Sequence, residues 1–203
     1  KNYGIEKEVY KKTKKLNPYN FVLELSKFTK QSDIFVTANA TAAIVPNQAL
    51  KFKKNQRFIG NSTSGSMGYG LPAAIGACIA KPKNRVFCFE GDGSLQMNIQ
   101  EIATVAKNNL KMVLFVISND GYHSIRQTQN NYFKDNLIGI DSKTGISFPN
   151  LKHIANAYGI KYKKVTINNY KNFLSELNSI KFPILAEVIV DKNIDFKPRV
   201  KSR

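Results

Sequence analysis

The sequence has little cysteine and no long hydrophobic run. Its two cysteines, Cys78 and Cys88, lie in apolar surroundings without C-x-x-C spacing, which argues against a cysteine metal site. We interpret both as buried thiols of a protein from a reducing compartment. The longest apolar stretch of low charge, residues 67–80, is too short and too rich in glycine to cross a bilayer. No N-terminal signal pattern is recognisable, so we expect a cytoplasmic location, provided that no signal precedes this sequence.

Acidic residues are also few compared with basic ones. Lys and Arg total 31 against 14 Asp and Glu, which gives a formal net charge of +17. A basic balance can indicate nucleic-acid binding. However, the lysines are spread along the whole chain, and the sequence has no RNP-like aromatic motif, no zinc-finger spacing and no basic heptad region. We therefore expect neither nucleic acid nor a membrane as the main partner.

A chain of 203 residues suits one large domain with a sizeable core. It begins with Lys1 rather than Met, and we expect a fragment of a longer chain. Residues 1–15 are polar and rich in lysine, which is typical of a linker or a peripheral arm. The main domain is predicted at 16–192, and residues 193–203 are predicted to start a C-terminal tail.

Helical and strand patterns alternate along the main domain. Strands are predicted at 33–37, 57–60, 85–90, 112–118, 161–165 and 183–190, and helices at 18–30, 40–49, 71–80, 98–109, 151–158 and 169–179. This alternation predicts an α/β fold, a parallel sheet flanked by helices on both faces, in which ligands bind beyond the carboxyl ends of the strands. The long polar stretch 119–149 is predicted to be functional or to carry a short helix of its own.

Polar residues directly follow two of these strands. Gly91-Asp92-Gly93-Ser94 follows one buried strand, and Asn119 follows the next. Since a single helix separates the strands, we expect them to be neighbours, with Asp92 and Asn119 brought together at one sheet edge. Carboxylate and amide oxygens suit Mg²⁺, which commonly shares its ligand shell with phosphates. Gly91 and Gly93 permit close approach of the backbone, and backbone N–H groups with the Ser94 hydroxyl are suited to diphosphate oxygens.

This pattern resembles the cofactor motif of thiamine-diphosphate (ThDP) enzymes, which is GDG, about two dozen residues, and then Asn-Asn. Ser118 replaces the first Asn of the motif, but the family's ligand is the second, which falls on Asn119. The family's third protein ligand is a backbone carbonyl two positions later, at Gly121. The resemblance therefore implies a Mg²⁺ site formed by Asp92, Asn119 and Gly121.

A second stretch, residues 64–77, resembles the segment that holds the aminopyrimidine ring in acetolactate-synthase-like enzymes. By that resemblance Met67 lies between the two rings of the cofactor, where a flexible thioether fills an irregular gap. The Gly65 carbonyl would accept a hydrogen bond from the 4′-amino group. Tyr122 and Ile125 are further candidates for lining the pocket. The resemblance covers nearly the whole chain from residue 16 onward.

The resemblance implies one domain of a longer 2-keto-acid decarboxylase or carboligase. Its cofactor would lie between this domain and a pyrimidine domain of the same or a partner chain, and that second domain would supply the catalytic glutamate. We expect no catalytic residue in this chain, which alone would be inactive. A 2-keto acid such as pyruvate is the expected substrate, and a homodimer or tetramer is the expected assembly. FAD, which some relatives bind in a middle domain, cannot be judged from this sequence.

Several alternatives stay open. The chain could be a non-catalytic partner subunit with the same fold. The segment 119–133 departs from typical acetolactate synthases, which favours a pathway-specific relative acting on a modified sugar or another keto compound. His123 could be an acid or base near the reacting carbon, or a histidine with a structural hydrogen bond. Glu90 occupies a strand end, and we expect no catalytic role for it.

Overall fold

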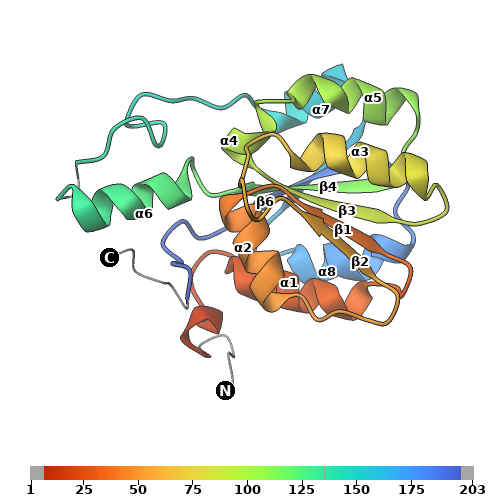
Figure 1. Cartoon of the computed structure of the whole chain (residues 1–203), viewed down its shortest axis with the longest axis horizontal. Helices are drawn as coiled ribbons and strands as arrows, with labels where there is room; N and C mark the ends of the chain where they lie inside the picture. The colour runs from red at the N-terminus through yellow and green to blue at the C-terminus, as the bar shows by residue number, and fades with distance from the viewer. Residues whose placement is uncertain (1–6, 135, 198–203) are drawn as a thin grey trace.

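One parallel sheet organises the molecule (Figure 1). The computed structural model describes residues 7–134 and 136–197. The strands are β1 (Ile34–Thr37), β2 (Arg57–Gly60), β3 (Val86–Gly91), β4 (Met112–Ser118), β5 (Lys161–Val165) and β6 (Ile184–Ile189). They form a six-stranded sheet in the order β2-β1-β3-β4-β6-β5, and every pairing is parallel. The predicted α/β fold is therefore confirmed.

Helices cover both faces of this sheet, as predicted. The α-helices are α1 (Pro18–Leu25), α2 (Ala40–Ala49), α3 (Gly70–Ala80), α4 (Asp92–Leu95), α5 (Ile102–Lys107), α6 (His123–Tyr132), α7 (Leu151–Ala157) and α8 (Tyr170–Ser175). Short 3-10 turns lie at Lys7–Tyr10, Ser26–Phe28, Ile99–Glu101 and Glu176–Asn178. Helices α1, α2 and α8 share one apolar cluster with the sheet, and α3, α5 and α7 share the other (Figure 1).

The central strands are buried on both faces because alternate side chains enter opposite clusters. In β3, Phe87 enters the cluster under α1 and α2, whereas Cys88 enters the cluster under α3. The Phe87 ring stacks between those of Phe35 and Phe115, with centroids 5.5 and 5.7 Å away. Cys78 also belongs to the α3 cluster, and both thiols are free and buried.

A buried ion pair lies before the first residues of β1 and β3, at the amino edge of the sheet. Arg85 donates through Nε and Nη2 to the two carboxylate oxygens of Asp33, at 3.1 and 2.6 Å. The same guanidinium donates to the carbonyls of Leu177 (2.9 Å) and Phe28 (3.2 Å) and lies 4.6 Å from the centre of the Phe87 ring. One side chain thus connects four segments on the edge opposite to the predicted site.

Two predicted helices differ in extent from the structure. The helix expected at 18–30 ends at Leu25 and continues as a 3-10 turn to Phe28. The helix expected at 98–109 is a 3-10 turn followed by the short α5, so no long helix begins near Asn98. The polar stretch 119–149 carries a helix of its own, one of the two outcomes predicted for it; this helix, α6, projects from the body of the molecule (Figure 1). Within the described residues, no helix is both long and apolar enough to cross a membrane.

Both ends of the described chain pack against the domain. Near the N-terminus, Val9 is buried and its carbonyl accepts a hydrogen bond from the Asn17 side chain at 2.7 Å. Near the C-terminus, Ile194 and Phe196 are buried in the same apolar cluster as Val9. The proposed domain boundaries stay predictions.

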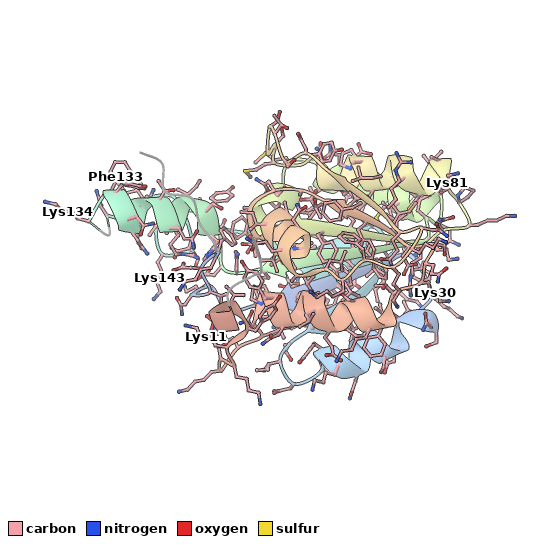
Figure 2. The ribbon with its side chains drawn as sticks, turned by 60° about the horizontal axis from the view of Figure 1, so that its bottom comes forward. Lys11, Lys30, Lys81, Phe133, Lys134 and Lys143 are labelled. Atoms are coloured by element: carbon pink, nitrogen blue, oxygen red, sulfur yellow. The ribbon has the colours of Figure 1, made fainter. Side chains whose placement is uncertain are left out.

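The lysines are distributed over the molecule. In Figure 2, Lys30 and Lys81 lie toward one end of the molecule, and Lys134 and Lys143 lie toward the other.

Candidate functional site

Asp92 and Asn119 meet at the carboxyl edge of the sheet. Strands β3 and β4 are neighbours, with Gly91 paired to Ile117, so the residues that follow them emerge side by side. One carboxylate oxygen of Asp92, Oδ2, accepts the backbone N–H groups of Asn119 and Gly121, each at 3.2 Å. The other, Oδ1, accepts the Gly93 N–H at 2.9 Å. The predicted juxtaposition of Asp92 and Asn119 is thus present in the structure.

The Asp92 carboxylate is buried without a basic partner. It is 6% exposed, and none of the ion pairs among the described residues includes it. Burial raises the pKa of this carboxyl to about 6, and the N–H groups of Gly121, Gly93 and Asn119 act in the opposite direction. A buried carboxylate is costly unless a cation compensates it, so this position fits a bound metal ion.

Asn119 has a side-chain oxygen that is free to act as an acceptor. It is 6% exposed, and its side-chain Nδ2 donates to the Thr41 hydroxyl at 3.1 Å, which leaves the amide oxygen as its acceptor. The Gly121 carbonyl accepts the His123 N–H at 3.1 Å and retains a second lone pair. A carboxylate, an amide oxygen and a carbonyl are hard oxygen donors that fit Mg²⁺.

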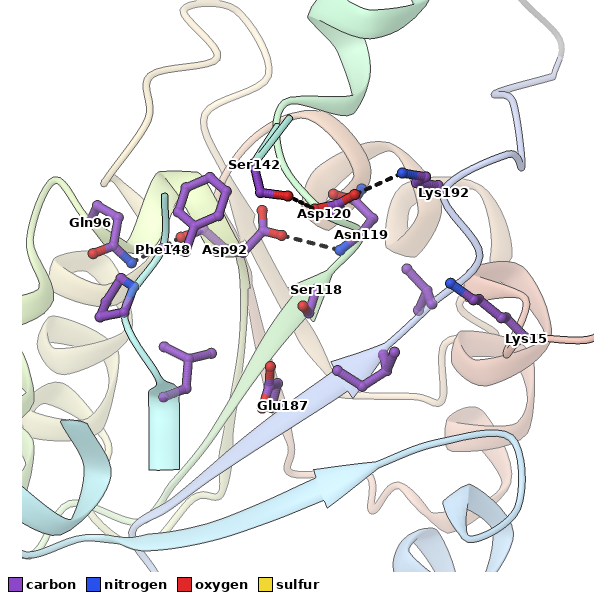
Figure 3. Close-up of a pocket in the computed structure, with 14 residues that line it drawn as sticks. Lys15, Asp92, Gln96, Ser118, Asn119, Asp120, Ser142, Phe148, Glu187 and Lys192 are labelled. Carbon is purple, nitrogen blue, oxygen red and sulfur yellow. Dashed lines mark hydrogen bonds and ion pairs between the residues drawn. The ribbon is translucent and has the colours of Figure 1, made fainter. Parts of the chain in front are cut away.

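Two cavities lie on either side of Asp92 and Asn119. The smaller, of about 90 Å³, lies where β1 and β3 end, and its walls include residues that follow both strands. It is lined by every predicted cofactor residue except Gly65, namely Met67, Gly91, Asp92, Gly93, Ser94, Asn119, Gly121 and Tyr122. The larger, of about 370 Å³, lies toward β6 and is shown in Figure 3, where Lys192 is paired with Asp120 near Asn119.

Met67 and Gly65 occupy different places. Met67 lines the smaller cavity, whereas Gly65 lies outside it in an exposed turn with a φ of +59°. The Gly65 N–H donates to the Asn61 carbonyl at 2.8 Å. The expected hydrogen bond from a cofactor amino group to the Gly65 carbonyl stays a prediction.

Two residues of the GDGS sequence make contacts within the protein. A Cβ built on Gly93 would lie 2.2 Å from Cε1 of Tyr122, so the Tyr122 ring itself requires glycine at this position. The Ser94 hydroxyl accepts the Gly68 N–H at 2.9 Å. These contacts give Gly93 and Ser94 structural roles in addition to the cofactor roles predicted for them.

The residues that begin α2 were missed by the sequence reasoning. Asn39, Ala40, Thr41 and Ala42 line the smaller cavity opposite the GDGS residues. Asn39 forms no side-chain cap, so the N-terminal N–H groups of α2 and the positive end of its dipole are suited to an anion. The signal was present in the sequence, because these residues follow directly after a predicted strand.

Glu90 was seen in the sequence only as a strand end. Its side chain is fully buried, and burial raises its pKa to about 7, with the Ser94 hydroxyl and neighbouring N–H groups acting in the opposite direction. One oxygen, Oε1, accepts the Leu71 N–H at 2.8 Å. This contact joins β3 to the start of α3.

His123 begins α6 and is buried. Its ring meets the Phe196 ring edge-on, with centroids 5.1 Å apart. Burial lowers the pKa of His123, and the nearby Arg126 lowers it further. The contact with Phe196 is one of packing, and among the described residues neither ring nitrogen has a hydrogen-bond partner. The structural hydrogen bond offered as one alternative is therefore not present in the described part of the chain, and His123 also lines the smaller cavity.

The strand order places the smaller cavity at a switch point of the sheet. The chain moves from β1 outward to β2 and then returns to β3 on the other side of β1, and ligands of open α/β sheets bind at such points.

Fold and site together define an α/β cofactor-binding domain. Residues 40–182 match the family described as "Thiamine pyrophosphate enzyme, C-terminal TPP binding domain", and the chain belongs to this family. Thiamine pyrophosphate is another name for ThDP.

Similar proteins carry the name acetolactate synthase. The "Acetolactate synthase large subunit" of Cyanidium caldarium is 32% identical over 189 residues, which cover 93% of this chain and 32% of that protein. Its namesake from Porphyra purpurea is 33% identical over 195 residues, covering 95% of this chain and 32% of that protein. "Acetolactate synthase 2, chloroplastic" of Nicotiana tabacum is 29% identical over 190 residues, which cover 91% of this chain and 29% of that protein.

The chain therefore spans about a third of the length of these relatives. The name of the tobacco protein places it in a plastid, and the cytoplasmic location expected for this chain stays a prediction.

Proposed function

We propose that this chain is the diphosphate-binding domain of a longer ThDP-dependent 2-keto-acid decarboxylase or carboligase, similar to acetolactate synthase. One observation carries the proposal: the buried Asp92 carboxylate has no basic partner among residues 7–134 and 136–197, and it lies beside Asn119 in a cavity that Met67 also lines. Asp92, Asn119 and the Gly121 carbonyl would hold Mg²⁺. The N–H groups of residues 91–94 and of the α2 N-terminus would bind the diphosphate.

The chain's own residues would bind and orient the cofactor. Met67 would hold the two rings in position, and Tyr122 would line the pocket. When bound, ThDP supplies an electron sink for decarboxylation of a 2-keto acid. We assign no catalytic residue to this chain, because the glutamate that the resemblance implies belongs to the pyrimidine domain. That domain, from the same or a partner chain, would complete the site within a homodimer or tetramer.

The segment after Asn119 favours a second candidate for the substrate. It folds into α6, whose first turn buries His123 and Arg126. Since this stretch departs from typical acetolactate synthases, a pathway-specific enzyme for a non-pyruvate keto compound or a modified sugar is the alternative. A non-catalytic partner subunit is disfavoured because Asp92, Asn119 and Met67 are all present.

The test is a titration of the full-length protein with ThDP, with and without Mg²⁺, followed by pyruvate while carbon dioxide is measured. Metal-dependent binding with carbon dioxide release is the expected result. Metal-dependent binding without release would support the alternative substrate. Absence of ThDP binding would contradict the proposal and favour the non-catalytic partner subunit.

A further inference from the structure

We propose that Glu90 is a positioning residue that fixes the loop carrying Met67 onto the segment carrying Asp92. The Met67 loop is defined as residues 61–69, and the Asp92 segment as residues 90–98. The inference rests on the proposed function, because it assigns these two parts to the ring half and the diphosphate half of one cofactor site.

Three side chains of the Asp92 segment hold the end of the Met67 loop and the start of α3. The Ser94 hydroxyl accepts the Gly68 N–H at 2.9 Å, and the Asn98 amide donates to the Gly68 carbonyl at 2.8 Å. Glu90 Oε1 accepts the Leu71 N–H at 2.8 Å. Both backbone groups of Gly68 are therefore paired with the Asp92 segment, and Glu90 adds a contact three residues further on.

Glycines permit the close approach of the two parts. A Cβ on Gly68, which has a φ of +78°, would lie 2.6 Å from the Met97 Cβ and 2.7 Å from Asn98 Nδ2. A Cβ on Gly70 would lie 2.5 Å from Glu90 Oε1 and 3.0 Å from the Ala38 Cβ. Real Cβ atoms do not approach other atoms closer than about 3 Å, so the Glu90 carboxylate occupies space that only glycine leaves free.

Glu90 also supplies what the start of α3 lacks. The residue preceding this helix, Tyr69, forms no side-chain cap. A carboxylate at a helix N-terminus accepts free N–H groups and interacts favourably with the dipole, and Glu90 does this from the neighbouring strand. Within the described part of the chain, its second oxygen, Oε2, is buried without a hydrogen-bond partner. The hydrogen bond to α3 offsets part of the cost of burying this carboxylate.

Loss of the Glu90 acceptor would leave the Leu71 N–H unpaired and remove one of the three polar contacts that hold the end of the Met67 loop and the start of α3. A ligand that uses both halves of the site would then bind more weakly. A ligand that uses only the diphosphate half would be unaffected. ThDP and inorganic pyrophosphate, each with Mg²⁺, are such a pair of probes.

The experiment compares Glu90→Leu and Glu90→Gln in the full-length protein by calorimetric titration with both probes. Glu90→Leu should weaken ThDP binding about 10-fold, as expected for an unpaired buried N–H group, and change pyrophosphate binding less than about 2-fold. Glu90→Gln keeps an acceptor oxygen for Leu71 and should restore ThDP affinity to within about 3-fold of the wild type. Amide hydrogen exchange at residues 68–71, measured without ligand, should be faster in Glu90→Leu and near wild type in Glu90→Gln.

Equal weakening of both probes, or unchanged ThDP binding in Glu90→Leu, would overturn the inference. If Glu90→Leu does not fold, Gly70→Ala replaces it, because the added Cβ displaces the same carboxylate. Its matched control is Gly76→Ala in the same helix, where a Cβ meets nothing within 4 Å. Selective loss of ThDP binding in Gly70→Ala alone supports the inference, and equal behaviour of the two alanine variants contradicts it. A wild-type protein that binds neither probe would instead refute the proposed function itself.

Discussion

The Asp92 carboxylate accepts the backbone N–H of Asn119 at 3.2 Å, although 27 positions separate the two residues. The contact arises because β3 and β4 are parallel neighbours with their carboxyl ends in register. It places the buried carboxylate beside the backbone of Asn119, whose side-chain oxygen is left as an acceptor because Nδ2 donates to Thr41. A backbone arrangement that is fixed in this way lowers the ordering cost of binding, which supports the proposed Mg²⁺ site.

Gly121 provides a test of how tightly the loop after β4 is fixed. A Cβ on Gly121 would lie 1.8 Å from the Ile140 carbonyl oxygen, and its φ is +111°. Gly121→Ala should lower the melting temperature and weaken Mg²⁺-dependent ThDP binding, because either the loop or the segment at Ile140 must move. The matched control is Gly145→Ala, which has a similar φ of +109° but no atom within 4 Å of the added Cβ. Gly145→Ala should lower the free energy of unfolding only by the cost of a side chain at positive φ, which is about 1–2 kcal/mol. Equal changes in melting temperature and in ThDP binding for the two substitutions would show that the contact of Gly121 with Ile140 does not fix the loop after β4.

The ion pair of Arg85 and Asp33 is predicted to be a main determinant of stability. Arg85→Met leaves the Asp33 carboxylate, which is 1% exposed, without a cation. Removal of one member of a buried pair costs about 3–5 kcal/mol, so denaturant unfolding of the full-length protein should show this domain strongly destabilised. Lys27→Met is the control, because its pair with Glu24 is exposed and such pairs contribute about 1 kcal/mol or less. If Arg85→Met lowered the free energy of unfolding as little as Lys27→Met does, the buried pair would not be a main determinant of stability.

The two cysteines should be unreactive in the folded protein. Burial raises the pKa of the Cys78 thiol to about 12 and that of Cys88 well above its usual value. Because the thiolate is the reacting species, we expect iodoacetamide at pH 8 to leave both unmodified until denaturant is added. Peptide mass mapping of the full-length protein measures this at each cysteine. Modification of either residue in the native protein, at the rate of an exposed thiol, would show that α3 or β3 opens.

Local patterns in the sequence predicted most of the fold. The strand at 112–118 has the predicted bounds because its apolar run is short, continuous and enclosed by polar residues. The meeting of Asp92 and Asn119 was also predictable, since it follows from parallel connectivity alone. The position of α6 was not, because its residues are mostly polar, as is common in loops.

Contacts between distant segments could not be predicted from the sequence. The Tyr122 ring on Gly93, and the Glu90 carboxylate on Leu71, depend on how loops pack after the sheet has formed. The α2 N-terminus follows a predicted strand, but it reaches the cavity only because β1 lies beside β3, and that strand order was not predicted. Sequence patterns identify the elements, but the atoms that line the cavity depend on the strand order.

The most direct measurement is calorimetric titration of the full-length protein with ThDP, with and without Mg²⁺, for Asp92→Ala and Asn119→Ala. Asp120→Ala is the matched control, because it removes a neighbouring carboxylate that is 43% exposed and paired with Lys192. We predict that the two site variants lose the Mg²⁺-dependent binding that the wild type and Asp120→Ala retain. Unchanged ThDP affinity in both site variants would contradict the assignment of Asp92 and Asn119 as metal ligands.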